Sequence, residues 1–161
     1  MSKNEDLRLL LASLVDYQVI RDDHIAEIPG ECAVMHTISL NKTAYSGYRE
    51  IEKTNEHITE QTARRVEAYL QFDFYAPTQA RAEEMANNML DVIFFKNRHD
   101  LVRKKFGLSD DNVEVVDRTF LEGSQYIYRF GFDINMNWRE ISQRKRKLIK
   151  DIDYETEAKN G

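Results

Sequence analysis

Hydrophobic and polar residues alternate most clearly along two stretches of the chain. Between Thr62 and Tyr75, every second residue from Val66 to Phe74 is apolar. Between Gln125 and Arg139 the alternation is longer, and its apolar row is Tyr126, Tyr128, Phe130, Phe132, Ile134, Met136 and Trp138. Successive side chains of a strand point to opposite faces, so this period predicts two long strands with one covered face each. Such strands are typical of antiparallel sheets.

Apolar residues recur at helical spacing in two other segments. From Glu5 to Leu14 they predict a short amphipathic first helix. A second helix is expected to start at Pro77-Thr78, and its apolar stripe is Ala82, Met85, Ala86, Met89 and Ile93. We expect this second helix to cover the sheet. A further helical turn is expected from His99 to Phe106, ended by Gly107.

Shorter signals predict three more strands. The first covers Tyr17 to Arg21, and Pro29-Gly30 forms a turn before the second, which begins near Ala33. In the second strand four residues are expected to share one face: Val34, His36, Ile38 and Leu40. The third is expected around Val113 to Thr119. This order of elements predicts an α+β fold with a mostly antiparallel sheet, one face of which is covered by helices.

Two charged segments show neither the alternation of a strand nor the apolar spacing of a helix. Residues 46–59 are predicted to form a long loop between strands. Arg139 to Lys150 is basic and Asp151 to Glu157 is acidic. We therefore predict a single domain over residues 1–140, with a charged C-terminal arm over residues 141–161.

Composition narrows the class of protein. A chain of 161 residues with 42% hydrophobic and 32% charged residues is long and apolar enough to fold around one core. Its single cysteine, Cys32, permits neither an intramolecular disulfide nor a cysteine-based metal cage. No apolar run approaches the roughly 20 residues that a membrane span needs, so no membrane partner is expected. The net charge of −5 argues against a surface built to bind nucleic acid everywhere.

Candidate catalytic and metal-binding residues are few. Asp22-Asp23-His24 offers three potential ligands, but consecutive residues rarely converge on one ion, and a solvated loop is the favoured interpretation. The histidines at positions 36, 57 and 99 are interpreted as structural, and Cys32 as a buried thiol. Because the common phosphate-loop, hydrolase and metal motifs are missing, we expect no catalytic residues, no metal and no cofactor. A small metal-dependent nuclease remains an alternative, and its acids would be Asp73, Glu114 and Asp117.

Charged and aromatic residues suggest instead a protein that assembles with others. The basic run near the C-terminus could contact nucleic acid, but docking on an oppositely patterned neighbour is favoured. The polar face of the predicted strands adds tyrosines and carboxylates of the kind found in interfaces. The candidate interface residues are Tyr48, Arg49, Glu50, Glu52, Lys53, Tyr69, Asp73, Arg144, Lys145, Arg146 and Lys147.

Three stretches, taken in order and spacing, resemble a known family. They are Val19-Ile20-Arg21 followed by a polar loop and a strand, Leu70 to Tyr75 followed by Ala80 to Met89, and Phe120 through Ile134. Together they resemble the neck or tail terminator proteins of tailed bacteriophages, small α+β proteins that form a hexameric ring at the head-proximal end of the tail tube. The resemblance spans about Leu7 to Trp138.

The resemblance implies a structural virion protein and not an enzyme. As a homo-hexameric ring it would cap the tail tube, end tail elongation and form the docking surface for the head connector. Its partners would be the tail tube protein, a neck or connector protein, and the sheath if the tail is contractile. DNA would pass through the ring without specific binding, and residues 45–59 would contact the tube or line the bore. Assembly would take place in the bacterial host cytoplasm. A head-side adaptor or tail-completion protein of the neck is the alternative.

Overall fold

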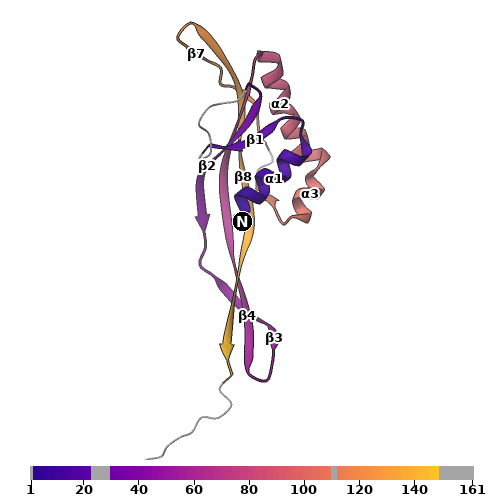
Figure 1. Cartoon of the computed structure of the whole chain (residues 1–161), viewed down its shortest axis with the longest axis vertical. Coiled ribbons are helices and arrows are strands. Elements are labelled where there is room, and N and C mark those ends of the chain that lie inside the picture. Colours follow the sequence, from indigo (N-terminus) through magenta and orange to yellow (C-terminus); the bar gives the residue numbers. More distant parts are fainter. Residues whose placement is uncertain (1, 23–29, 110–111, 149–161) are drawn as a thin grey trace, which may run out of the picture. The chain divides into compact units, whose positions relative to one another are not determined.

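The computed structural model describes residues 2–22, 30–109 and 112–148 (Figure 1). Its residues fall into two compact units. The core unit contains residues up to 43 together with 65–139, and the hairpin unit contains residues 44–64 together with those from 140 onward. The two longest strands contribute residues to both units.

The described residues form helices and strands in mixed order. The helical segments are α1 (Lys3–Leu14), α2 (Gln79–Asp91), the π-helical turn η2 (Val92–Lys96) and α3 (Arg98–Arg103). The strands are β1 (Gln18–Arg21), β2 (Cys32–Lys42), β3 (Ser46–Lys53), β4 (His57–Ala76), β5 (Gly107–Leu108), β6 (Val116–Asp117), β7 (Phe120–Glu122) and β8 (Gln125–Lys147). The predicted α+β class is confirmed.

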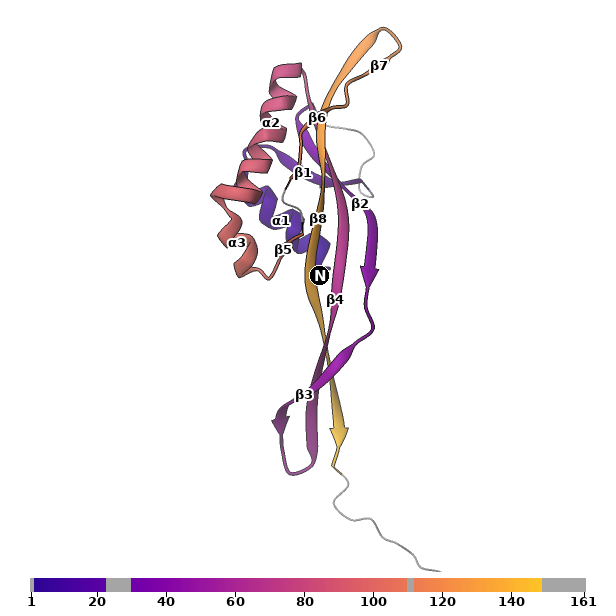
Figure 2. The same cartoon turned by 180° about the vertical axis from the view of Figure 1, so that it is seen from behind.

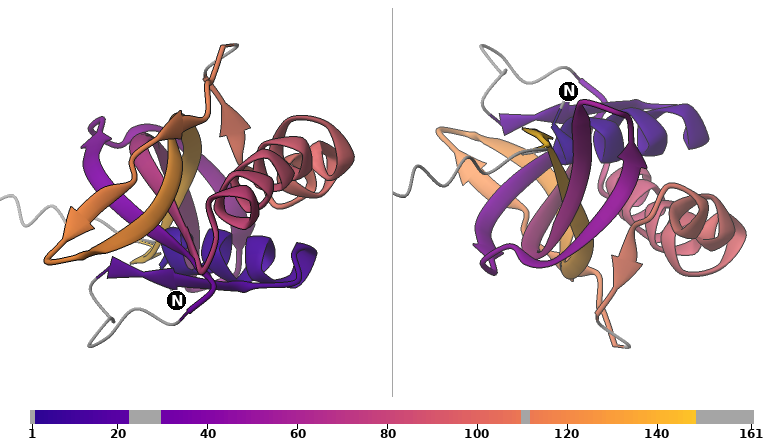
Figure 3. Two further views of the ribbon diagram at one scale, coloured as in Figure 1. Left: turned by 90° about the horizontal axis from the view of Figure 1, so that it is seen from above. Right: turned by 90° about the horizontal axis from the view of Figure 1, so that it is seen from below.

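The sheet is mostly antiparallel. Its strands follow the order β1-β2-β4-β8-β5, with β3 also beside β4, and β6 and β7 also beside β8. Only β1 and β2 pair in parallel among the pairs with a defined register. In the core unit the helices lie on one face of the sheet (Figures 2 and 3). The prediction of a sheet covered on one face by helices is therefore confirmed for this unit.

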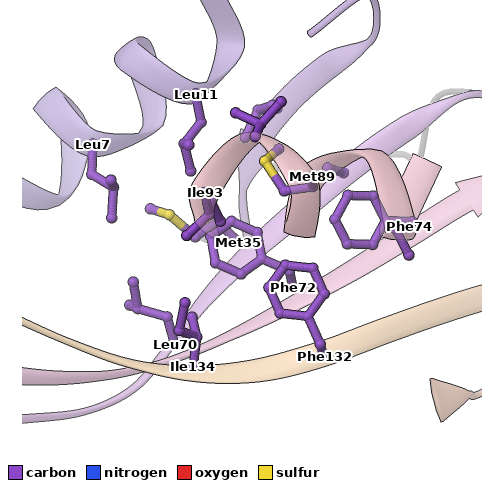
Figure 4. Packing of buried hydrophobic residues seen from close by; sticks show 14 of the residues in the cluster. Leu7, Leu11, Met35, Leu70, Phe72, Phe74, Met89, Ile93, Phe132 and Ile134 are labelled. Atoms are coloured by element: carbon purple, nitrogen blue, oxygen red, sulfur yellow. The ribbon is translucent and has the colours of Figure 1, made fainter. Parts of the chain in front are cut away.

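The apolar rows of β4 and β8 form the core, as their alternation predicted. The residues of β4 from Val66 to Phe74 that were expected to be covered are all fully buried. Phe132 of β8 packs its ring 5.3 Å from that of Phe72 and 5.6 Å from that of Phe74 (Figure 4). At the other end of the same row Tyr126 is exposed, so the β8 core begins at Phe130.

Helix α2 covers this core with the predicted stripe. Its N-cap is Thr78, whose side-chain oxygen accepts a hydrogen bond from the backbone N–H of Arg81, as the Pro77-Thr78 start signal implied. The buried residues of the helix are Ala82, Met85, Ala86 and Met89. Ile93, the last member of the stripe, lies in the π-helical turn η2 and is also buried.

The prediction that Val34, His36, Ile38 and Leu40 share one face of β2 holds for Val34 and His36, which pair in register with alternate residues of β4, and is wrong beyond Thr37. Ala33 and Met35 enter the main core, and Val34 packs on the opposite face of the sheet beside Cys32. The register with β4 shifts between Thr37 and Ser39. A β-bulge adds one residue to a strand, so the alternation that relates Val34 to Ile38 and Leu40 is interrupted, and both of the latter are exposed.

The prediction of a long loop over residues 46–59 is also wrong. Ser46–Lys53 form β3, which pairs with the beginning of β4. A short turn joins the two strands, and the hydroxyl oxygen of Thr54 there accepts hydrogen bonds from the N–H groups of Glu56 and His57. Every residue of β3 is exposed. Alternation marks a strand only when one of its faces is buried, which explains why this strand has no hydrophobic period.

Other boundaries shift by smaller amounts. Helix α3 ends at Arg103, before the predicted end at Phe106, and β6 covers only two residues of the strand predicted around Val113 to Thr119. Strand β8 continues through Lys147, so the first part of the predicted arm is extended β structure. The division at residue 140 stays a prediction. Pro29, Asp23 and His24, and the arm beyond Leu148, lie outside the described residues.

Candidate functional site

The hairpin unit is a sheet segment formed by β3, the first residues of β4 and the last residues of β8 (Figure 2). Within its described residues, no apolar side chain is buried. Thr59, a polar residue, is the sole buried side chain among them. Small sheets without a hydrophobic face or a covering helix are at best marginally stable alone. Something other than an internal core must therefore stabilise this unit.

Cross-strand charges on one face supply part of that stabilisation. Arg144 donates a hydrogen bond to Glu60 at 2.8 Å, and Arg146 approaches the same carboxylate at 3.0 Å. The guanidinium of Arg144 also lies over the ring of Tyr48, 4.9 Å from its centroid. Because these arginines are exposed, solvent screens each ion pair and cation–π contact, and each adds only a little to stability.

A second cluster repeats this arrangement farther along the same strands. Arg64 of β4 pairs with Glu140 of β8 at 2.6 Å and lies over the ring of Tyr45, 4.6 Å from its centroid. In both clusters one arginine bridges two strands and stacks on a tyrosine of the segment that includes β3. These contacts fix the register of the three strands without burying apolar surface.

The backbone of β3 requires a glycine. The register between β3 and β4 shifts between Ser46 and Tyr48, and Gly47 has a φ of +70°. Glycine adopts this left-handed conformation without steric cost, whereas a side chain would strain it. The bulge places Tyr48 over β4 at the position where it meets Arg144.

Both outer edges of the hairpin unit are open. Strand β3 pairs with β4 alone. Strand β8 pairs with β5, β6 and β7 only through residues that precede Trp138. Within the described residues, 141–147 of β8 thus have no strand on their outer side. Open edges present unpaired backbone N–H and C=O groups and are templates for pairing with another chain.

Most of the sequence-predicted interface residues gather in this unit. The candidates on β3 are Tyr48, Arg49, Glu50, Glu52 and Lys53, and those on β8 are Arg144, Lys145, Arg146 and Lys147. All of them are exposed. The structure brings Tyr48 and Arg144 into contact, and their role as interface residues stays a prediction.

Tyr69 and Asp73 lie in a different place, on the face of the core unit's sheet opposite the helices. Asp73 is only 1% exposed, so its carboxylate contacts residues of its own chain and not solvent. Arg118 donates hydrogen bonds to Asp73 and to Asp133, each at 2.9 Å. Tyr69 donates to the other oxygen of Asp133 at 3.0 Å. These residues tie the segment before β7 to β4 and β8.

Histidine and glutamine complete the shell around Asp73. Gln71 donates to the carboxylate at 2.8 Å, and Nε2 of His36 lies 3.3 Å from it. Burial alone would raise the pKa of Asp73, but the hydrogen bonds from His36, Arg118 and Gln71 outweigh burial and lower it to about 2. The hydrogen bond to Asp73, with a second one to Asp22, raises the pKa of His36 against the opposing effect of burial.

A close approach at Gly131 makes room for this network. A Cβ at this position of β8 would lie 2.6 Å from Nη1 of Arg118 and 2.7 Å from Oδ1 of Asp73, and it would also clash with the backbone oxygen of Phe72. Only glycine fits there without displacing the ion pair. The network is therefore built into the strand packing of the core unit.

Sequence reasoning missed several of these residues. Glu60, Arg64, Arg118 and Asp133 were not singled out, although each makes an ion pair with another segment of the chain. Each comes from an ordinary charged position, and nothing in its local sequence indicates its partner. Glu60 follows the segment interpreted as a loop, and Arg64 lies within the predicted strand of residues 62–75, where its charge gave no sign of its partner.

The acids proposed for a nuclease do not form one cluster. Asp73 is engaged by Arg118, whereas Glu114 and Asp117 are exposed. Within residues 2–22, 30–109 and 112–148, no group of three or more His, Cys, Asp or Glu side chains could hold a metal ion. In the same ranges no helix is long and apolar enough to cross a membrane.

Burial also decides the reactivity of the cysteine. Cys32 is fully buried beside Val34 and Tyr75. Burial raises the pKa of its thiol to about 11. The thiolate is the nucleophilic form, so Cys32 has no features of an activated nucleophile.

Comparison with known proteins agrees with the resemblance seen in the sequence. A search of curated proteins finds no match. A family model described as phage neck terminator protein matches residues 5–161, which is nearly the whole chain. The chain therefore belongs to the phage neck terminator protein family and is a structural component of the virion neck that interacts with other tail or neck proteins.

Proposed function

We propose that this protein ends the phage tail as a closed ring of identical subunits, six in number, that caps the tail tube. One surface of the ring contacts the tail tube protein, and another receives the head connector. A further tube ring cannot add to the second surface, so elongation stops. In a contractile tail the ring also contacts the sheath.

The observation that carries this proposal is the hairpin unit. It exposes two strand edges and buries no apolar side chain among its described residues. A closed ring uses one heterologous contact repeatedly, in which two different surfaces of the same chain meet. Such a contact covers edges that the isolated chain leaves exposed. The family assignment supports the location in the neck.

The proposed ring surrounds the path of the DNA. A net charge of −5 disfavours adhesion of a polyanion, so DNA passes through the bore without specific binding. No enzymatic step is needed for this role. Assembly takes place in the cytoplasm of the bacterial host, before the tail joins the head.

Solution mass tests the ring directly. Light scattering of the purified protein, at several concentrations and two salt levels, is expected to give a species near six times the chain mass of 19.0 kDa. A monomer that becomes hexameric only on added tail tubes also supports the proposal. Electron microscopy of the capped tubes then locates the ring at one end. A monomer or dimer at every concentration that ignores tail tubes contradicts it.

A further inference from the structure

The two open edges of the hairpin unit differ in sequence but are alike in length. The β3 edge is Ser46–Lys53, and the β8 edge is residues 141–147. Each lies on the outer side of the same three-stranded segment, with β4 between them. One chain therefore carries two edges that a second copy could pair, one on each side.

The directions of the strands limit how copies can meet. Strand β3 is antiparallel to β4. The contacts Arg64–Glu140, Gln61–Gln143 and Glu60–Arg144 show that β8 is also antiparallel to β4, because one strand advances as the other recedes. Thus β3 and β8 run in the same direction. In a rotationally symmetric ring, the β8 edge of one subunit and the β3 edge of the next can meet only as parallel strands.

The charges of the two edges favour pairing of β8 with β3 over pairing of β8 with a second β8. The end of β8 carries four consecutive cations, Arg144 to Lys147. Two β8 edges placed side by side would bring like charges together, which destabilises a sheet. The β3 edge carries two carboxylates, Glu50 and Glu52, between Arg49 and Lys53. It is the edge of the chain that offers acids to β8.

The side chains that would meet can be identified from the register. Arg144 and Arg146 bind Glu60 on one face of the segment, so Lys145 and Lys147 lie on the other face. Neither lysine forms an ion pair with any described residue. Glu52 pairs in register with Thr59, next to Glu60, and hence lies on the same face as the two lysines.

We propose that the β8 edge of one subunit pairs in parallel with the β3 edge of the next subunit, so that the hairpin units of neighbouring copies form one continuous sheet. This inference rests on the proposed ring and names the surface that closes it. Adding a strand to an open edge is a recurrent mode of protein recognition. Here the added strand belongs to a second copy of the same chain.

Disulfide cross-linking tests the pairing. The double variant Glu52→Cys with Lys145→Cys places both thiols on the same face. Within one subunit the two positions are separated by β4, about 10 Å apart, which is beyond the reach of a disulfide. Oxidation of the assembled ring is therefore expected to link neighbouring subunits and to give a ladder of covalent oligomers on a non-reducing gel. Strand tilt can shift the pairing by two residues, so Arg49→Cys with Lys145→Cys is tested beside it.

Three controls make the result specific. Glu50 pairs in register with Glu60 and lies on the opposite face from Lys145, so Glu50→Cys with Lys145→Cys is expected to give no ladder. The unmodified chain reports on Cys32, which is buried and is expected not to react. Unchanged thermal unfolding of each variant shows that the substitutions leave the fold intact.

The outcomes separate this inference from the proposed function. A hexamer by light scattering that gives no ladder from either same-face pair overturns the inference and leaves the ring in place. Covalent dimers from Glu52→Cys alone indicate pairing of two β3 edges and also overturn it. The absence of any oligomer, with or without tail tubes, overturns both.

A charge exchange provides a second measurement without cysteines. Lys145→Glu is expected to raise the protein concentration needed for ring formation by about tenfold, and adding Glu52→Lys is expected to restore it. Failure of the second substitution to restore assembly overturns the pairing.

Discussion

The core unit and the hairpin unit are parts of one chain that are stabilised in different ways. In the core unit, β4 and β8 bury a continuous apolar row beneath α1 and α2. In the hairpin unit the same two strands bury no apolar side chain among the described residues, and cross-strand arginines pair with glutamates and stack on tyrosines instead. A single strand is thus stabilised by burial of apolar side chains along one part of its length and by polar cross-strand contacts along another.

This contrast between the two units indicates where assembly should add stability. Burial of apolar surface is the dominant favourable contribution to folding, so the core unit has its stabilisation within the chain. Exposed ion pairs contribute little each, so the hairpin unit has much to gain from a partner. Elements that order on assembly commonly come from the less stable part of a protein.

Truncation of a core aromatic side chain should show most clearly that the two units differ in their contribution to the free energy of unfolding. Phe72→Ala removes a fully buried ring that packs on Phe132 and is expected to lower the free energy of unfolding by about 3–5 kcal/mol. Tyr48→Ala removes an aromatic side chain from the hairpin unit, where it is 65% exposed, and is expected to cost much less. Urea denaturation followed by circular dichroism measures both. Equal losses would remove the distinction between the units.

A single methyl group should disturb the buried ion pair of the core unit. Gly131→Ala forces a Cβ against Arg118, Asp73 and the backbone of Phe72 and is expected to cost up to about 3 kcal/mol. Gly30→Ala is the matched control, because a Cβ there meets no atom within 4 Å. Thermal unfolding compares the two variants. A stable Gly131→Ala protein would show that the strands can separate without cost.

Acid should weaken the core unit through Asp73. The pKa of this carboxyl falls from its ordinary value of 3.8 to about 2 on folding, so its contribution is present above pH 4 and is lost as the pH falls toward 2. The shift corresponds to about 2 kcal/mol. In Asp73→Asn the contribution is missing at every pH, so the stability difference from the unmodified protein should shrink across this range. Parallel curves for the two proteins would contradict the assignment.

Histidine 36 should act in the opposite direction on the same network. Its pKa is raised on folding by Asp73 and Asp22, so its contribution is present below its unfolded pKa of 6.5 and is lost as the pH rises through the higher folded value. His36→Gln is expected to flatten the stability profile above pH 6. An unchanged slope in that range would show that the imidazole does not gain charge on folding.

The smallest effect is expected from the stacked arginine of the hairpin unit. Arg144→Ala releases both Glu60 and Tyr48 and is expected to speed amide exchange in β3 by several-fold, with little change in the global unfolding midpoint. Lys145→Ala is the control in the free chain, since Lys145 makes no ion pair with a described residue. Hydrogen exchange with mass spectrometry measures the local change. Equal exchange in both variants would argue that the arginine does not hold β3.

The core unit was the more predictable of the two from the sequence. The apolar rows of β4 and β8 and the stripe of α2 were identified because one-sided burial leaves a period in the sequence. The β2 bulge broke the period at Ile38, and the prediction for that strand failed at that point. The network around Asp73 was not predicted, since its members come from several separate segments.

The hairpin unit was the less predictable. Residues 46–59 were expected to form a loop because an exposed strand has no buried face to mark it. The charged residues there were selected as interface candidates by composition alone, and their contacts with β8 depend on pairing between segments far apart in the chain. Thr54 in the turn and the glycine before Tyr48 are local features of this hairpin.

The α+β class, the core rows and the family resemblance could be recognised from the amino-acid sequence, because hydrophobic periodicity and the order of segments are visible along the chain without knowledge of which segments pair. Tertiary structure alone decided that the charged segment is a strand, that Asp73 is buried among cations, and that two strand edges remain open. Those features arise from pairing between distant residues, and the free energy of such pairs depends on which partners the fold brings together.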